Sequence, residues 1–234
     1  MGGVHAPRES GGESAVAPRC LGRSFGEKQN EDNRHKTPHP EVQARTFAPL
    51  VLCSVLTRGH TVPGLISKEA AERWYAELSA WYPAEHDTRG WDDSLGWLHA
   101  VAHGADATAA FAKALPHRRA ELLELCALRM TSAQVDYRYA QSEDARLARA
   151  LTRILQAPGL KHEQATDWLT VVAKALDGGG TGPLPIWAFN TFATLQSRHV
   201  HLTRGLADEG VPPHAEAVAA RTADLLRLPY RWLA

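Results

Sequence analysis

Cysteine is scarce in this chain, and long apolar runs are missing. Three cysteines, Cys20, Cys53 and Cys126, occur among 234 residues. An odd number without short spacing argues against a disulfide framework and against a cysteine-based zinc site. No stretch approaches the roughly 18–20 apolar residues that span a bilayer, and the N-terminus lacks the apolar core of a signal peptide. We therefore expect a cytoplasmic protein without membrane partners.

The chain also has no excess of charge of either sign. Lysine and arginine together number 26, and aspartate and glutamate also number 26. This balance predicts no nucleic-acid partner, because such partners require a basic surface. Apolar residues make up 44% of the chain, which is enough for a sizeable core.

Familiar catalytic motifs are absent as well. The glycine-rich stretch at 178–184, GGGTGPL, lacks the Lys-Ser/Thr pair of a phosphate-binding loop and follows an expected helix, not a strand. No Gly-x-Ser-x-Gly nucleophile elbow occurs. The sequence therefore leaves open whether the protein is an enzyme.

Two regions differ in composition. Residues 1–38 are rich in glycine, proline and polar residues without a helical or strand period, which predicts a disordered or poorly ordered tail. Residues 39–234 show helical periodicity and are predicted to form a single all-helical domain. The expected helices are 41–58, 67–81, 94–115, 117–131, 142–156, 163–177, 185–208 and 213–228.

Local signals support these boundaries. Ser67 and Ser142 are expected N-caps, and the acidic Glu143 and Asp144 suit the positive end of a helix dipole. No alternating stretch is bounded by hairpin turns, so we expect no strands. The fold class is therefore all-α, either as stacked antiparallel helical pairs in a short HEAT-like solenoid or as a compact bundle.

The densest group of polar side chains lies between residues 85 and 106. On a helix with about 100° per residue, His99, His103 and Asp106 share one stripe, flanked by small residues. A loop before this helix adds further groups. The candidate ligand-binding residues are Glu85, Asp87, Arg89, Trp97, His99, His103 and Asp106.

Three interpretations of this group stay open. His99, His103 and Asp106 could bind one metal ion, zinc or iron, with Glu85 or Asp87 as a further ligand. The zincin motif is excluded because Ala100 follows the first histidine. The group could instead be a hydrogen-bonded network that only fixes packing. A pocket for a small molecule or peptide without metal is the third interpretation.

The same residues carry a family resemblance. The segments EHDTRGW, GWLHAVAHGAD, SEDARLARAL and RTFAPLVL resemble a family of bacterial proteins known as domain of unknown function 2785. The resemblance runs from about Val42 to the C-terminus and implies an all-helical, HEAT-like fold, but no activity. Its motif residues are Glu85, Asp87, Arg89, Gly90, Trp97, His99, His103, Gly104 and Asp106.

We therefore expect a helical domain that binds a small ligand or peptide near this polar cluster. One alternative is a metal-dependent hydrolase, with Glu85 or Asp87 as base and a metal-bound water as nucleophile. Another is a protein-interaction scaffold in which the cluster is purely structural.

Overall fold

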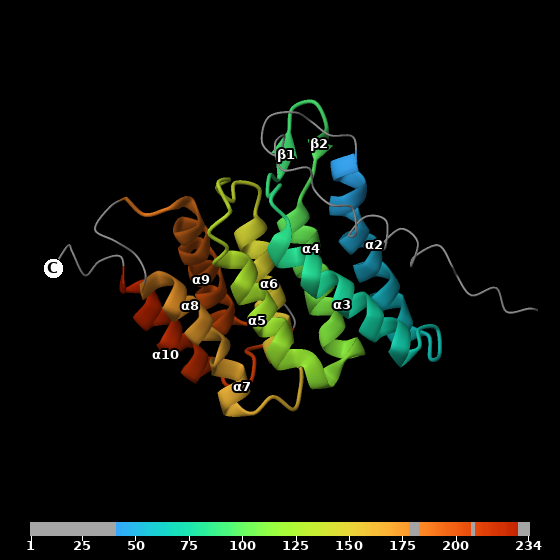
Figure 1. Ribbon diagram of the computed structural model, residues 1–234. Coiled ribbons are helices and arrows are strands. Elements are labelled where there is room, and N and C mark those ends of the chain that lie inside the picture. The colour runs from blue at the N-terminus through green and yellow to red at the C-terminus, as the bar shows by residue number, and fades with distance from the viewer. Residues whose placement is uncertain (1–40, 178–182, 207–208, 229–234) are drawn as a thin grey trace, which may run out of the picture.

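The computed structural model describes residues 41–177, 183–206 and 209–228, so the prediction for residues 1–38 lies outside it. The described chain is mainly helical, as predicted (Figure 1). The helices are α2 (Glu41–Thr61), α3 (Lys68–Ala84), α4 (Ala100–Ala114), α5 (Arg119–Met130), α6 (Glu143–Gln156), α7 (His162–Thr166), α8 (Trp168–Asp177), α9 (Ile186–Arg204) and α10 (Ala215–Leu226), with a 3-10 turn, η1 (Pro116–Arg118). No helix in these ranges has the length and apolar character needed to cross a bilayer.

The two expected N-caps behave differently. The Ser67 hydroxyl accepts a hydrogen bond from the Ala70 N–H at 3.2 Å, so Ser67 caps α3 as predicted. Ser142 does precede α6, but its side chain makes no capping bond, because its backbone adopts the left-handed conformation (φ 66°). Residue Glu143 accepts the neighbouring Gln141 N–H at 2.8 Å instead.

The expectation that strands are absent was wrong at one place. Strands β1 (Trp91–Asp92) and β2 (Gly96–Trp97) form a short antiparallel hairpin, so α4 begins at Ala100 instead of residue 94. The Asp92 carboxylate accepts the N–H of Ser94 at 2.9 Å and so fixes the turn. Two-residue strands are too short to show an alternating pattern, which is why periodicity did not indicate them.

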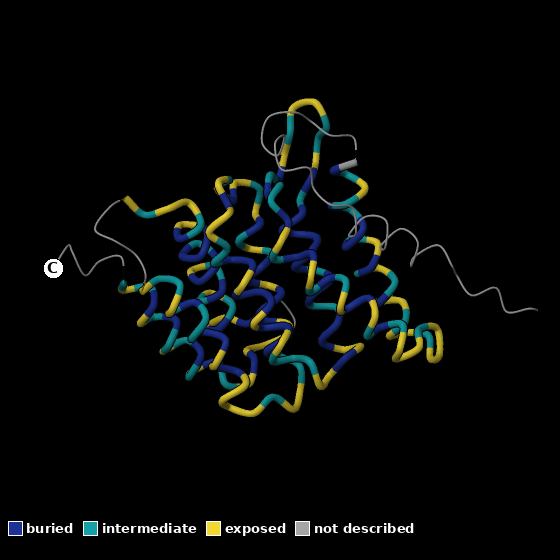
Figure 2. Tube along the Cα trace, viewed as in Figure 1, coloured by how far each residue is buried: buried dark blue, intermediate teal, exposed yellow. Residues whose placement is uncertain are grey.

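The helices form two layers (Figure 1). One layer contains α2, α4, α6 and α9 in that spatial order, and the other contains α3, α5, α8 and α10. Each helix of the first layer is followed in sequence by a helix of the second, with the short α7 between α6 and α8, so the chain is built of stacked helical pairs. One continuous apolar core runs between the layers, and Figure 2 shows buried residues concentrated there. The resemblance to HEAT repeats stays a prediction.

Helix α4 is central to the first layer because small residues let its neighbours approach closely. A Cβ atom built on Gly104 would overlap the aromatic ring of Tyr82 from α3. The Tyr82 hydroxyl donates to the Val101 carbonyl at 2.7 Å. Gly104, a motif residue, is therefore explained by close packing between α3 and α4.

Candidate functional site

Glu85 is an anchor between α2 and α3. Its side chain is almost fully buried. The carboxylate accepts hydrogen bonds from Arg45 Nε at 2.5 Å, from Trp81 Nε1 at 2.9 Å and from the Asp87 N–H at 2.9 Å. These bonds hold the end of α3 against α2.

Asp87, Arg89 and Asp92 form a second ion-pair group at the base of the hairpin. Arg89 donates to both Asp87 oxygens, at 2.9 and 2.7 Å, and to Asp92 Oδ2 at 2.6 Å. Hydrogen bonds from Ser94 to Asp92 lower the pKa of Asp92 to about 2. Arg89 therefore pairs with both Asp87 and Asp92, and it braces the hairpin.

His99 lies at the junction between the hairpin and α4. Its backbone is left-handed (φ 53°), an uncommon conformation for a residue other than glycine. Its ring stacks on Trp97, with centroids 4.6 Å apart, and His99 Nδ1 lies 3.4 Å from Glu143 Oε1. Burial lowers the pKa of His99 and raises the pKa of Glu143. Glu143 was expected only to favour a helix dipole, but it is a fully buried neighbour of this histidine.

His103 faces α2. Its Nδ1 is 3.0 Å from the Thr46 carbonyl, which can only accept, so Nδ1 carries the proton. The ring meets Phe47 edge to face, with centroids 4.7 Å apart. The residue is 6% exposed, and burial lowers its pKa to about 4. His103 is therefore a neutral packing residue at pH 7.

Asp106 faces α6, where Arg146 binds it through both carboxylate oxygens, with Nε 3.1 Å from Oδ1. The three residues of the predicted stripe thus turn to different partners: Glu143, Thr46 and Arg146. The hydrogen bonds and ion pairs form separate groups, and none joins Asp106 to the side chains of the loop.

A shared metal site was predicted for His99, His103 and Asp106. The structure does not bring them together in that way, and the described residues contain no group of three or more His, Cys, Asp or Glu side chains arranged to hold a metal ion. The physical reason is that α6 supplies the partners of two of these residues: His99 Nδ1 lies beside Glu143, and Arg146 binds the Asp106 carboxylate.

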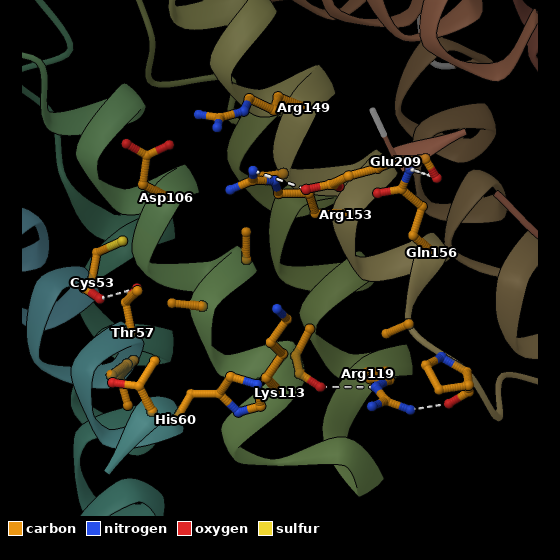
Figure 3. A pocket seen from close by; sticks show the side chains of 18 residues that line it. Cys53, Thr57, His60, Asp106, Lys113, Arg119, Arg149, Arg153, Gln156 and Glu209 are labelled. Carbon is orange, nitrogen blue, oxygen red and sulfur yellow. Dashed lines mark hydrogen bonds and ion pairs between the residues drawn. The ribbon is translucent and has the colours of Figure 1, made fainter. Parts of the chain in front are cut away.

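A pocket of about 590 Å³ opens between α2, α4 and α6. Of the seven candidate residues, Asp106 alone lines it. We call it the α2–α4–α6 pocket (Figure 3). Its lining residues are Cys53, Leu56, Thr57, His60, Thr61, Asp106, Ala109, Ala110, Ala112, Lys113, Arg119, Arg149, Ala150, Arg153, Gln156, Ala157, Pro158 and Glu209.

The charges that line the pocket are not balanced. Asp106 is paired with Arg146, and Glu209 Oε1 lies 3.1 Å from Arg153. Lys113 and Arg149 are exposed and form no ion pair with any described residue. Arg119 binds only carbonyls, so the wall presents three cations without a carboxylate partner among the described residues, which favours an anionic ligand.

Sequence reasoning missed these cations. Arg146, Arg149 and Arg153 lie at spacings of three and four along α6, so they share one face of the helix. Such a basic stripe could have been found from the sequence. The sequence alone could not show that Lys113 and His60 line the same pocket. They do so only because α4 and α2 pack beside α6.

The chain is similar to one family of proteins. A family model described as "Protein of unknown function (DUF2785)" matches residues 34–200. The match includes the loop, the hairpin and all three helices of the α2–α4–α6 pocket. No curated protein and no solved structure matches the chain.

Proposed function

Since the chain belongs to the DUF2785 family, whose description gives no activity, we propose a function from the site alone: the protein is a helical domain that binds a small molecule in the α2–α4–α6 pocket. The motif residues around Glu85, His99 and His103 act indirectly in this proposal. They fix the hairpin, α2 and α6 around α4, and so keep the pocket open.

The observation that carries this proposal is the pocket itself. A volume of about 590 Å³ falls within the range of small-molecule sites, roughly 300–1,000 Å³. Apolar lining from Leu56 and several alanines is combined with a few polar groups, as in most ligand sites. Asp106 is the one candidate residue that borders it.

The hydrolase alternative has less support. It needs a metal ion held by His99, His103 and Asp106, but the described residues contain no group of three such side chains arranged to hold one, and Arg146 binds the Asp106 carboxylate. The carboxylate of Glu85, proposed as a base, is buried and accepts four hydrogen bonds from Arg45, Trp81 and Asp87, so it is not exposed to a substrate.

Native mass spectrometry and thermal shift measurements test the proposal. We expect the purified protein to retain a small molecule, or to gain stability with members of a metabolite mixture. Ala110→Trp should remove binding, because Ala110 lines the pocket and an indole would fill it. Ala114→Trp is the matched control, since Ala114 is an exposed residue of the same helix outside the lining. Equal binding by both variants would place any ligand elsewhere.

A second candidate, an interaction scaffold, is favoured by one observation. Trp91 and Trp97 on the hairpin are 42% and 48% exposed, and their rings meet edge to face at 4.9 Å. The hairpin projects from one end of the helical layers (Figure 1). Exposed tryptophans are frequent at protein interfaces. Native mass spectrometry tests this function. It would be favoured over ligand binding if Trp91→Ala lost a protein partner that Ala110→Trp still bound.

A further inference from the structure

Helices α2, α4 and α6 each present one continuous face to the α2–α4–α6 pocket. On α6 this face carries Arg149 and Arg153, four residues apart, and on α4 it carries Asp106 and Lys113, seven apart. Residues three, four and seven apart lie on one side of a helix, so these charges line the cavity together. In Figure 3, Arg149 lies at one edge of the pocket, Lys113 lies lower down on α4, and Arg153 is placed between them.

The cationic side chains that line the pocket differ in whether other protein groups already bind them. Arg119 donates from Nε to the Ala112 carbonyl at 2.8 Å and from Nη1 to the Pro158 carbonyl, so it is held in place and keeps its charge. The Glu209 carboxylate neutralises Arg153 at the rim. Arg149 and Lys113 have no hydrogen-bond or ion-pair partner among the described side chains, so their charge and donors face the pocket.

We infer that the ligand of the α2–α4–α6 pocket is a small organic anion with at least two negative charges, of the phosphate or carboxylate type. This inference rests on the proposed function and adds the class of ligand. Arg149 binds one anionic group with its planar fork of donors, and Lys113 binds another as a point charge. Arg119 adds a fixed positive charge at the α5 end of the pocket.

The rest of the wall suits the organic part of such a ligand. Leu56, Ala109 and Ala150 provide apolar surface between the charged ends. Burial raises the pKa of the Cys53 thiol, which favours the neutral, protonated form. The pocket is therefore a binding site with cationic ends and an uncharged floor.

A substitution of Asp106 should strengthen the binding of an anion in the pocket. Its carboxylate repels an anion and also holds Arg146, which belongs to the same stripe of α6 as Arg149. Asp106→Asn removes the negative charge and weakens the hold on Arg146. We expect this substitution to strengthen anion binding, an effect that damage to the fold cannot produce.

The experiment is isothermal titration calorimetry of the full chain with two probes, inorganic pyrophosphate and citrate. We expect at least one probe to bind, with affinity that falls as salt rises. Arg149→Ala and Lys113→Ala should each weaken it about tenfold, corresponding to the loss of one charge-assisted contact. Arg204→Ala is the matched control, because Arg204 is an exposed arginine of α9 outside the pocket.

Several outcomes would overturn the inference. Binding of neither probe would do so, as would equal loss in Arg149→Ala and Arg204→Ala. Vesicles with phosphatidic acid separate a lipid headgroup from a free anion, and binding to vesicles alone would also contradict it. The proposed function would survive these results if an uncharged molecule still bound and was lost in Ala110→Trp. If no molecule of any kind bound, both would fail.

Discussion

At the residue scale, the buried imidazole of His103 makes stability depend on pH. Burial lowers its pKa to about 4 from 6.5, so the unfolded chain takes up the proton first as the pH falls. Stability is fully present above about pH 6.5 and is lost progressively toward pH 4, by on the order of 1–3 kcal/mol. Urea denaturation at about pH 7.5 and pH 4.5 measures this loss.

His103→Ala should cost on the order of 1–3 kcal/mol at neutral pH, because the Thr46 carbonyl loses its donor. The stability of the variant should also fall less than that of the parent as the pH is lowered. His60→Ala, at an exposed position of α2, should change neither property. If His103→Ala unfolded at the same urea concentration as the parent, this histidine would have no structural role.

Gly104→Ala gives a prediction opposite to helix propensity. In an exposed helix, replacing glycine by alanine stabilises by about 1 kcal/mol. Here the added methyl would overlap the Tyr82 ring, so we expect a loss of about 1–3 kcal/mol. Gly59→Ala within α2 meets only the flexible side chain of Ile66 and should cost less. Thermal melts of the two variants compare them, and a more stable Gly104→Ala would contradict this packing.

At the scale of elements, the end of α3 depends on an arginine from α5. Arg129 is buried, and its Nη1 donates to the carbonyls of Tyr82 and Glu85 at 2.8 and 2.7 Å. The last carbonyls of a helix have no partner within it, so Arg129 satisfies groups that would otherwise be buried without one. The side chain therefore joins α3 to α5.

Arg129→Met keeps the bulk of the side chain but removes both hydrogen bonds. We expect a loss on the order of 2–4 kcal/mol in chemical denaturation. Arg204→Met, at an exposed site, should stay within about 0.5 kcal/mol of the parent. If the two variants unfolded at the same denaturant concentration, Arg129 would have no part in holding α3.

At the scale of the whole molecule, one apolar core links the first helices to the last. Leu52 of α2, Leu123 of α5 and Val218 of α10 belong to the same continuous cluster. A shared core favours unfolding in one cooperative step. Circular dichroism and tryptophan fluorescence should therefore give coincident denaturation curves. Separate transitions would divide the helices into two folding units and would contradict the predicted single domain.

The sequence by itself determined the helices and the region of the polar cluster. Helical periodicity and the cap at Ser67 are local, so they could be interpreted without knowledge of contacts. The density of polar groups between Glu85 and Asp106 also marked residues that the fold does use. Local signals failed at the hairpin, where two strands of two residues each leave no period.

Only the tertiary structure decided what the marked residues do. Glu85 binds Arg45 and Asp106 binds Arg146, and each pair is separated by 40 residues. No local period encodes such a pairing, because it depends on how whole helices pack. The α2–α4–α6 pocket has the same origin, since the cations Lys113 and Arg149 become neighbours of one cavity only when α4 packs beside α6.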